Sequence, residues 1–304
     1  MTTTVTARHE PAQDEQIAVR GTDVGRYYRH WRGGTWALRH CDVSLPPGRI
    51  AALVGANGAG KTTLLRLLAG VLAPSEGSVA IDPNRRDVPV AGRVSFVAQD
   101  KPLYRRFTVN DMLRFGAHLN RLWDRKTATD WLDRFDIPRT GQCGRLSGGQ
   151  QSQVALAIAL GARPSVLLLD EPLSVLDPLA RREVMGALLN IAADAGMTVV
   201  LSTHVVTDLV GVADHLLLLA AGRLLVDGDI DTLLARHVRY IGPRSDTPPV
   251  TGDVVRATHT ERQSTFLVHR AAGTPEPPVA EPWLARPVTL EEFVLAQLTS
   301  EAAR

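Results

Sequence analysis

The chain has 304 residues, 44% of them hydrophobic and 22% charged, which is typical of an ordinary globular protein with a sizeable core. Its 34 Lys and Arg residues and 32 Asp and Glu residues leave a formal net charge of +2, which argues against a protein that coats nucleic acid. The two cysteines, Cys41 and Cys143, have no CxxC spacing, so a disulfide framework or a cysteine zinc site is not expected. No apolar run approaches the roughly 18 residues of a membrane-spanning helix, and the first residues lack the apolar core of a secretory signal.

Short β-rich runs alternate with helical patterns from Ile17 to about Tyr240, which predicts an α/β core with a parallel sheet. The polar residues 1–15 before it are predicted to be a disordered tail. Apolar runs predict strands at 50–54, 93–97, 166–169 and 198–201. Between about Thr108 and Pro138 the β pattern disappears and two amphipathic helices are predicted, the first of them capped by Thr108. A helical insertion therefore interrupts the α/β core.

The composition changes after Tyr240, where GPRSDTPP is typical of a linker. Residues 253–258 and 265–270 are predicted to pair as a hairpin. The spacing Thr289-x-x-Glu292 resembles a capping box and predicts a short helix after it. The predicted domains are therefore a main domain over 16–240, with a helical subdomain at about 100–162, and a small C-terminal α+β extension over 241–304.

The residues that follow the predicted strand 50–54 match the phosphate-binding pattern G-x-x-x-x-G-K-[ST]. Glycines let the backbone wrap around an anion with its N–H groups pointing inward, and the next helix adds its positive N-terminal end. Lys61 is predicted to reach the β- and γ-phosphates, and the Thr62 hydroxyl to ligate Mg²⁺. A glycine-rich turn that binds nothing is the alternative, but a strand before the loop and a helix after it favour phosphate binding. The predicted binding residues are Gly55, Ala56, Asn57, Gly58, Ala59, Gly60, Lys61, Thr62 and Thr63.

Two acidic residues, Asp170 and Glu171, follow the apolar run 166–169. This places both carboxylates at the carboxyl edge of the sheet, where α/β folds bind ligands. Asp170 is predicted to hold Mg²⁺, which prefers oxygen ligands, and Glu171 to accept a proton from the water that attacks the γ-phosphate. The alternative is that the two acidic residues only cap the end of a strand, and the presence of the phosphate loop argues against it.

A second candidate anion site is the segment Leu146-Ser147-Gly148-Gly149-Gln150, which precedes an apolar helix. Its serine and glycines present backbone donors at a helix N-terminus. In isolation such a segment is equally typical of a flexible turn.

With these motifs in this order, the chain resembles the nucleotide-binding domain of ABC transporters over roughly residues 17–240. The match consists of GANGAGKTT, LSGGQ, VLLLDEP, the SVLD stretch 174–177, and LSTH, which ends at His204. The resemblance implies a P-loop NTPase fold that binds ATP and Mg²⁺ and hydrolyses ATP. It also implies that Gln99 senses Mg²⁺ or the attacking water, that His204 contacts the γ-phosphate, and that Asp177 touches an opposing subunit. Ser147, Gly148, Gly149 and Gln150 would contact the ATP of that subunit.

The resemblance also implies an aromatic residue upstream of the loop that stacks on adenine. Tyr28 is the first choice, with Trp31 and Tyr27 as competitors, because RHWRGGTW looks like a small local insertion.

One chain holds one phosphate loop and one LSGGQ segment, so the resemblance implies a second nucleotide-binding domain, either another copy or a similar chain. It further implies separate integral membrane permease subunits, and hence a cytoplasmic protein held at the inner face of the cell membrane. The helical insertion, with Arg105 and Arg106, is the predicted docking surface, although this pair is equally typical of a solvated basic face. The NGAGKTT form and the C-terminal VTLEEFVLAQL resemble exporter-type subunits, which predicts export.

The alternatives are an ABC-type ATPase that acts on ribosomes or DNA, and a P-loop kinase or GTPase. The former usually has two nucleotide domains or a long coiled coil, and neither is found here. LSGGQ and the His204 spacing argue against the latter. No nucleic acid partner is expected.

Overall fold

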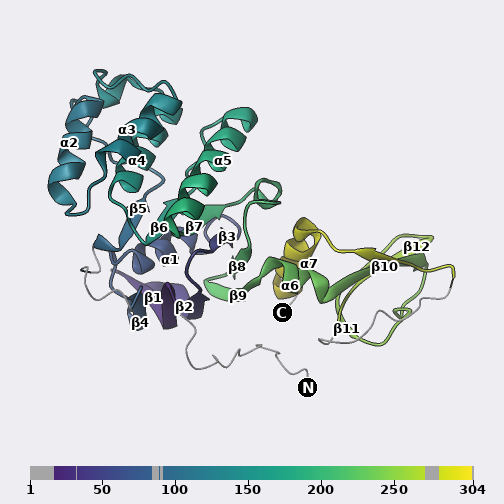
Figure 1. Cartoon of the computed structure of the whole chain (residues 1–304). Coiled ribbons are helices and arrows are strands. Elements are labelled where there is room, and N and C mark those ends of the chain that lie inside the picture. Colours follow the sequence, from purple (N-terminus) through teal and green to yellow (C-terminus); the bar gives the residue numbers. More distant parts are fainter. Residues whose placement is uncertain (1–16, 32, 84–88, 90–91, 271–280, 303–304) are drawn as a thin grey trace.

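The computed structural model describes residues 17–31, 33–83, 89, 92–270 and 281–302 (Figure 1), so the predicted tail at 1–15 lies outside the described residues. The centre of the fold is a six-stranded sheet with the order β5-β6-β7-β3-β8-β9. Its strands are β3 (Ile50–Val54), β5 (Val94–Val97), β6 (Val166–Asp170), β7 (Thr198–Thr203), β8 (His215–Ala220) and β9 (Arg223–Asp229). The strands from β5 to β8 pair in parallel and β9 is antiparallel at the edge. The predicted α/β sheet and its four predicted strands are confirmed.

Both faces of this sheet are buried, as the continuous apolar runs of its strands require. In β3, Ala52 and Val54 belong to one core cluster, whereas Ala51 and Leu53 belong to the other. Helix α1 (Lys61–Leu68) and an antiparallel sheet with the order β2-β1-β4 pack on the second face. The strands of this second sheet are β1 (Val19–His30), β2 (Gly33–Leu45) and β4 (Glu76–Ile81). The residues predicted as a local insertion thus extend β1 and β2 into a long hairpin.

The predicted helical insertion forms a group of helices apart from the sheet (upper left in Figure 1). Its helices are α2 (Val109–Leu119), α3 (Arg125–Arg134) and α4 (Gly148–Gly161), and α5 (Pro178–Ala195) lies beside them. The predicted cap of α2 is confirmed, because Thr108 Oγ1 accepts from the Asp111 N–H and the Asp111 carboxylate accepts from the Thr108 N–H. The Thr108 hydroxyl also donates to the Asp111 carboxylate at 2.6 Å, and this bond, with the one from the Thr108 N–H, lowers the pKa of Asp111.

The C-terminal residues form a four-stranded antiparallel sheet with the order β11-β12-β10-β13, away from the central sheet (right in Figure 1). The strands of this sheet are β10 (His237–Pro243), β11 (Asp253–His259), β12 (Gln263–His269) and β13 (Leu284–Pro287), and the helices α6 (Ile230–Ala235) and α7 (Leu290–Ala302) precede and follow them in the chain. The predicted hairpin is confirmed as β11 and β12, and Thr289 and Glu292 form the predicted capping hydrogen bonds. The boundary expected at residue 240 falls inside β10, so this strand belongs to the C-terminal sheet.

Helix α7 joins the C-terminal sheet to the central α/β domain. Phe293 and Val294 are buried in the same cluster as Leu209 and Leu218 of the main domain. The 3₁₀-helix η3 (Val206–Leu209), which follows β7, is one of the elements that α7 contacts. The C-terminal extension is therefore packed on the core, close to the end of β7.

His237 is a buried titratable group at this junction, and we expect it to make the free energy of unfolding depend on pH. Its Nδ1 lies 2.7 Å from the Leu233 carbonyl oxygen, and its ring lies 5.0 Å from that of His269. Burial lowers the pKa of His237, the Leu233 hydrogen bond opposes this, and the charges of His269 and Arg236 add to it. Because the folded state disfavours the protonated ring, the contribution of His237 to the free energy of unfolding is complete above the ordinary histidine pKa of about 6.5. This contribution is lost as the pH falls below that value.

In urea titrations at about pH 7.5 and 5.5, we expect the wild type to lose more free energy of unfolding between the two pH values than His237→Gln does. An equal loss in the two proteins would contradict this role of His237.

Candidate functional site

The loop between β3 and α1 has the close backbone packing that glycine permits. Gly60, the N-cap of α1, has a φ of 108°, and a Cβ there would lie 2.8 Å from the Ala37 carbonyl oxygen. A Cβ on Gly55 would lie 2.2 Å from the Leu219 carbonyl oxygen. A side chain at either position would therefore push the loop away from the strands that hold it.

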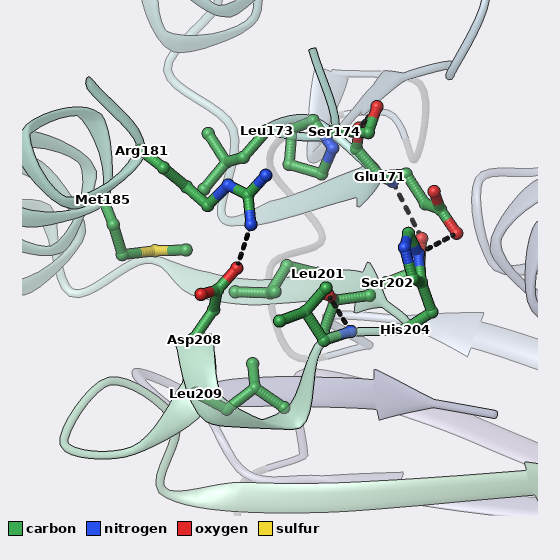
Figure 2. Close-up of a pocket in the computed structure, with 13 residues that line it drawn as sticks. Glu171, Leu173, Ser174, Arg181, Met185, Leu201, Ser202, His204, Asp208 and Leu209 are labelled. Carbon is green, nitrogen blue, oxygen red and sulfur yellow. Dashed lines mark hydrogen bonds and ion pairs between the residues drawn. The ribbon is translucent and has the colours of Figure 1, made fainter. Parts of the chain in front are cut away.

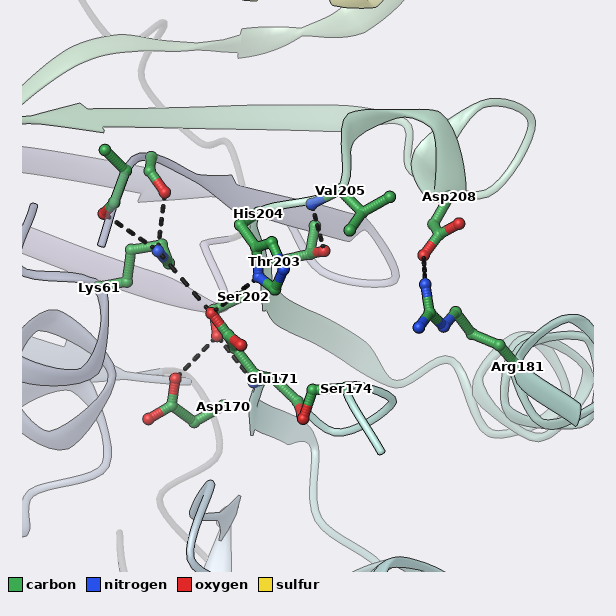
Figure 3. A network of polar contacts seen from close by, with 12 residues as sticks. Lys61, Asp170, Glu171, Ser174, Arg181, Ser202, Thr203, His204, Val205 and Asp208 are labelled. Carbon is green, nitrogen blue, oxygen red and sulfur yellow. Dashed lines mark hydrogen bonds and ion pairs between the residues drawn. The ribbon is translucent and has the colours of Figure 1, made fainter. Parts of the chain in front are cut away.

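Lys61, the first residue of α1, lies under this loop. It is 6% exposed, and its Nζ donates to the carbonyl oxygens of Gly55 at 2.7 Å and Ala56 at 3.2 Å. The same Nζ lies 4.0 Å from Glu171 Oε1 (Figure 3). Burial lowers the pKa of Lys61, and the carboxylates of Glu171 and Asp170 act in the opposite direction. The ammonium group thus lies where two loop carbonyls and the acidic pair meet.

The Asp170 carboxylate and the Glu171 backbone are both held by a residue of the neighbouring strand. Asp170, the last residue of β6, pairs with Ser202 in β7. Ser202 Oγ donates to Asp170 Oδ1 at 2.8 Å and accepts from the Glu171 N–H at 2.8 Å. Glu171 has a φ of 46°, a left-handed conformation that costs a non-glycine residue about 1–3 kcal/mol. The Ser202 hydroxyl helps to hold Glu171 in this conformation.

His204 and Gln99 meet Glu171 at one cavity of about 410 Å³. His204 follows β7, and its Nδ1 lies 3.3 Å from Glu171 Oε1. Gln99 follows β5 at the carboxyl edge of the sheet and is exposed. The cavity is lined by Ala37, Asn57, Gly58, Gly60, Lys61, Thr62, Thr63, Gln99, Glu171 and His204. The structure therefore brings the phosphate loop together with Gln99, Glu171 and His204, which follow the strands β5, β6 and β7.

Asp170 offers a test of whether the site suits a cation. The residue is 1% exposed, and its Oδ2 is buried with no hydrogen-bond partner among the described residues. An unpaired buried carboxylate oxygen is costly unless a cation or a donor binds it. Oxygen ligands are those that Mg²⁺ prefers, and Thr62 and Gln99 line the adjacent cavity. These donors fit the predicted ion.

The Ser147 segment lies outside this cavity. Ser147 is the N-cap of α4, its Oγ accepts from the Gln150 N–H at 3.2 Å, and Gln150 Oε1 accepts from the Ser147 N–H at 3.0 Å. Neither these two residues nor Gly148 and Gly149 are among those that line the cavity. Ser147 and Gly148 are exposed, so the positive end of α4 faces outward.

Asp177 is the N-cap of α5, and its Oδ1 accepts from the N–H groups of Leu179 and Ala180, each at 3.0 Å. The residue is exposed, as a contact with another subunit would require. Its carboxylate also has a local role, because it stabilises the first turn of α5.

The three aromatic candidates for adenine stacking are not among the described residues that line the cavity. Arg26 Cζ lies 5.1 Å from the centre of the Tyr28 ring, and the Tyr27 ring packs 5.2 Å from Trp36. Trp31 is 87% exposed at the turn between β1 and β2. The residue of this hairpin that reaches the cavity is Ala37, which sequence reasoning missed.

Comparison with known proteins now identifies the family. Residues 38–174 match the family model for ABC transporters. The chain is 34% identical over 210 residues to the thiamine import ATP-binding protein ThiQ of Vibrio parahaemolyticus, which covers 64% of this chain and 87% of that protein. The chain belongs to the ATP-binding proteins of ABC transporters.

Two further ABC transporter proteins support this membership. The Fe(3+) ions import ATP-binding protein FbpC of Yersinia pestis is 32% identical over 259 residues, 82% of this chain and 71% of that protein. The structure of cbiO1 from Clostridium perfringens, part of the ABC transporter complex cbiONQ, superposes with a TM-score of 0.60 at 28% identity, covering 73% of this chain and 92% of that one.

As an ABC transporter ATP-binding protein, the chain binds and hydrolyses ATP. The predicted P-loop NTPase fold and ATPase activity are confirmed. The predicted export is not supported, because ThiQ and FbpC are both import ATP-binding proteins. Among the described residues, no helix is both long enough and apolar enough to cross a membrane.

Proposed function

We propose that this ABC transporter ATP-binding protein hydrolyses ATP at the interface of two nucleotide-binding domains and powers transport through separate integral membrane permease subunits. The second domain is another copy of this chain or a similar chain. The observation that carries the proposal is the separation of Ser147, at the exposed end of α4, from the cavity that contains Lys61. One copy has two half-sites for an anion, and a second copy in reversed orientation would complete both.

In each composite site, the phosphates of ATP would lie along residues 55–60, where backbone N–H groups and the end of α1 favour negative charge. Lys61 would direct its ammonium donors to the β- and γ-phosphates. The segment 147–150 of the opposite domain would cover the γ-phosphate, and Asp177 would contact that domain. Tyr28 remains our first choice for stacking on adenine.

Glu171 would act as the general base, because its carboxylate lies at the cavity between Lys61 and His204. It would accept the proton of the attacking water, and His204 would hold the γ-phosphate beside it. Asp170, Thr62 and Gln99 would hold Mg²⁺, which when bound neutralises charge on the phosphate oxygens. Ser202 supports this arrangement by bonding both Asp170 and the Glu171 backbone.

The helical insertion would dock on the permease, which would hold the protein at the inner face of the cell membrane. Support comes from a patch of exposed aromatic rings that begins five residues after Gln99. Tyr104 packs 5.0 Å from Phe107 and 5.4 Å from Phe115, and all three are exposed. Arg105 and Arg106 lie exposed in the same segment. Exposed aromatic residues flanked by arginine are typical of the centre of a protein interface.

The direction of transport is tested separately, because the ATP site does not contact cargo. The names of the relatives favour import of a small solute over the export that the sequence motifs predicted. Reconstitution with the native permease in vesicles decides between the two directions by the side on which ATP drives accumulation.

Ser147→Arg should abolish the ATP-driven dimer and leave ATP binding to the single chain unchanged within about twofold. A bulky cation at the end of α4 would occupy the space in which the partner's γ-phosphate is proposed to bind. The measurement is light scattering with Mg-ATP in a Glu171→Gln background. Thr108→Arg is the matched control, because it removes the equivalent cap of α2, at a cost of about 1 kcal/mol, away from the proposed interface. A dimer that persists in Ser147→Arg would contradict the composite site.

A further inference from the structure

A second, smaller cavity of about 60 Å³ lies behind the catalytic carboxylate. One wall consists of residues 171–174, which lead toward Asp177, and another of residues 201–205, which contain His204 (Figure 2). Glu171 and His204 line both this cavity and the larger one. The cavity therefore separates the segment that leads to Asp177, proposed to contact the partner domain, from the segment that carries His204.

Arg181 of α5 spans this gap. Its Nη1 donates to Asp208 Oδ2 at 2.7 Å, and its Nη2 donates to the Leu176 carbonyl oxygen at 3.2 Å. Leu176 immediately precedes Asp177, and Asp208 lies in η3, four residues after His204. Figure 3 shows the Arg181–Asp208 pair at the end of the chain segment that runs on from His204 and Val205. One guanidinium group thus bonds both segments.

Packing alone does not account for an arginine here. Arg181 and Asp208 have side-chain exposures of 22% and 32%, and Arg181 Nε is buried with no hydrogen-bond partner in the part of the chain that the structure describes. A buried unpaired donor is destabilising, and an apolar side chain beside Met185 and Leu209 would avoid this cost. A partly buried ion pair is often no more stabilising than such a replacement. The planar fork of arginine, in contrast, can bond two acceptors in a fixed geometry.

We propose that Arg181 is a positioning residue that links the 174–177 segment to His204 through Asp208. The inference rests on the proposed function, in which Asp177 contacts the opposing domain. When the two domains close, movement of the 174–177 segment would pass through the Leu176 carbonyl oxygen and Arg181 to Asp208, and so to His204. The pair would thereby hold His204 beside Glu171, where Nδ1 lies 3.3 Å from Glu171 Oε1, while the two domains close. Its loss should slow hydrolysis without weakening ATP binding.

The test is a double-mutant cycle on the full-length chain with Arg181→Met, Asp208→Asn and the double variant. We expect each single change to lower kcat about tenfold with KM for ATP within about twofold, and the double variant to be no slower than either single. Arg181→Lys should recover part of kcat, because it keeps the charge but loses the fork. Arg182→Met is the matched control, since Arg182 is the exposed neighbour on α5, and its kcat should stay within about twofold of wild type.

An unchanged kcat in Asp208→Asn, with Tm and ATP-driven dimer intact, would overturn the role of Arg181 even if Arg181→Met failed to fold. Losses of kcat that add in the double variant would also overturn it, because independent effects would then explain both. Failure of the proposed composite site gives a different result: the Glu171→Gln protein with Arg181 and Asp208 intact would form no dimer with ATP.

Discussion

Glu171→Gln should lower the rate of ATP hydrolysis at least about 10²-fold while ATP affinity stays within about twofold. The amide has nearly the same shape as the carboxylate, so the cavity and the Ser202 hydrogen bond to the backbone N–H should persist. It is not basic enough to accept a proton from water. The loss therefore falls on the chemical step, and the variant should accumulate the ATP-bound state.

This prediction is measured by steady-state phosphate release and by nucleotide titration of the same preparation. Glu183→Gln is the matched control, because Glu183 is exposed on α5 and makes the same acid-to-amide change away from the cavity. Near-normal hydrolysis in Glu171→Gln would remove Glu171 from its role as general base. A large loss in Glu183→Gln would show that the assay reports damage to the fold instead.

Lys61→Ala should weaken ATP binding about 10- to 100-fold, as expected for the loss of hydrogen bonds between an ammonium group and phosphates. Lys61 lies at the one point where the phosphate loop, Glu171 and the cavity meet among the described residues. Its removal also leaves the Glu171 and Asp170 carboxylates without the nearby positive charge, which further disfavours bound phosphate.

The measurement is a titration of ATP against the full-length protein by calorimetry or a fluorescent analogue. Lys126→Ala is the control, since Lys126 is exposed on α3 and pairs with Asp130. Unchanged ATP affinity in Lys61→Ala would contradict the assignment of residues 55–63 as the phosphate loop. Thermal unfolding of the same variant checks that a lost affinity does not come from a lost fold.

Much of the site could be predicted because its residues lie in short local patterns. A glycine loop after an apolar strand predicted the position of Lys61, and two acids after another strand predicted that of Glu171. The structure brings these residues to one cavity because the strands are parallel and their carboxyl ends meet.

Other features depend on pairing between distant segments, which the linear sequence does not display. Ser202 contacts Asp170 because β6 and β7 pair in one particular register. The β1-β2-β4 sheet was not identified, since its strands contain register shifts that break the alternation of buried and exposed residues. The same irregular hairpin brings Ala37, instead of Tyr28, to the cavity.

The export prediction shows a different limit. It relied on the amino-acid sequence of the phosphate loop and on the C-terminal region around α7, and neither is proposed to contact a transported solute. The loop lines the cavity proposed to bind ATP, and α7 packs on the core beside η3. Residues with these contacts report ATP chemistry and stability, so the direction has to come from the permease.

The proposed transport role is tested most directly by identifying which proteins bind this ATPase in its ATP state. Tagged Glu171→Gln would be recovered from gently solubilised native membranes in Mg-ATP, with Ser147→Arg in the same background as the control, and analysed by mass spectrometry. We expect a polytopic membrane protein at near-stoichiometric yield, with a second nucleotide-binding domain that is lost in the Ser147→Arg control. Ribosomal proteins or nucleic acid with no membrane subunit would contradict the transport role and leave an ATPase with another task.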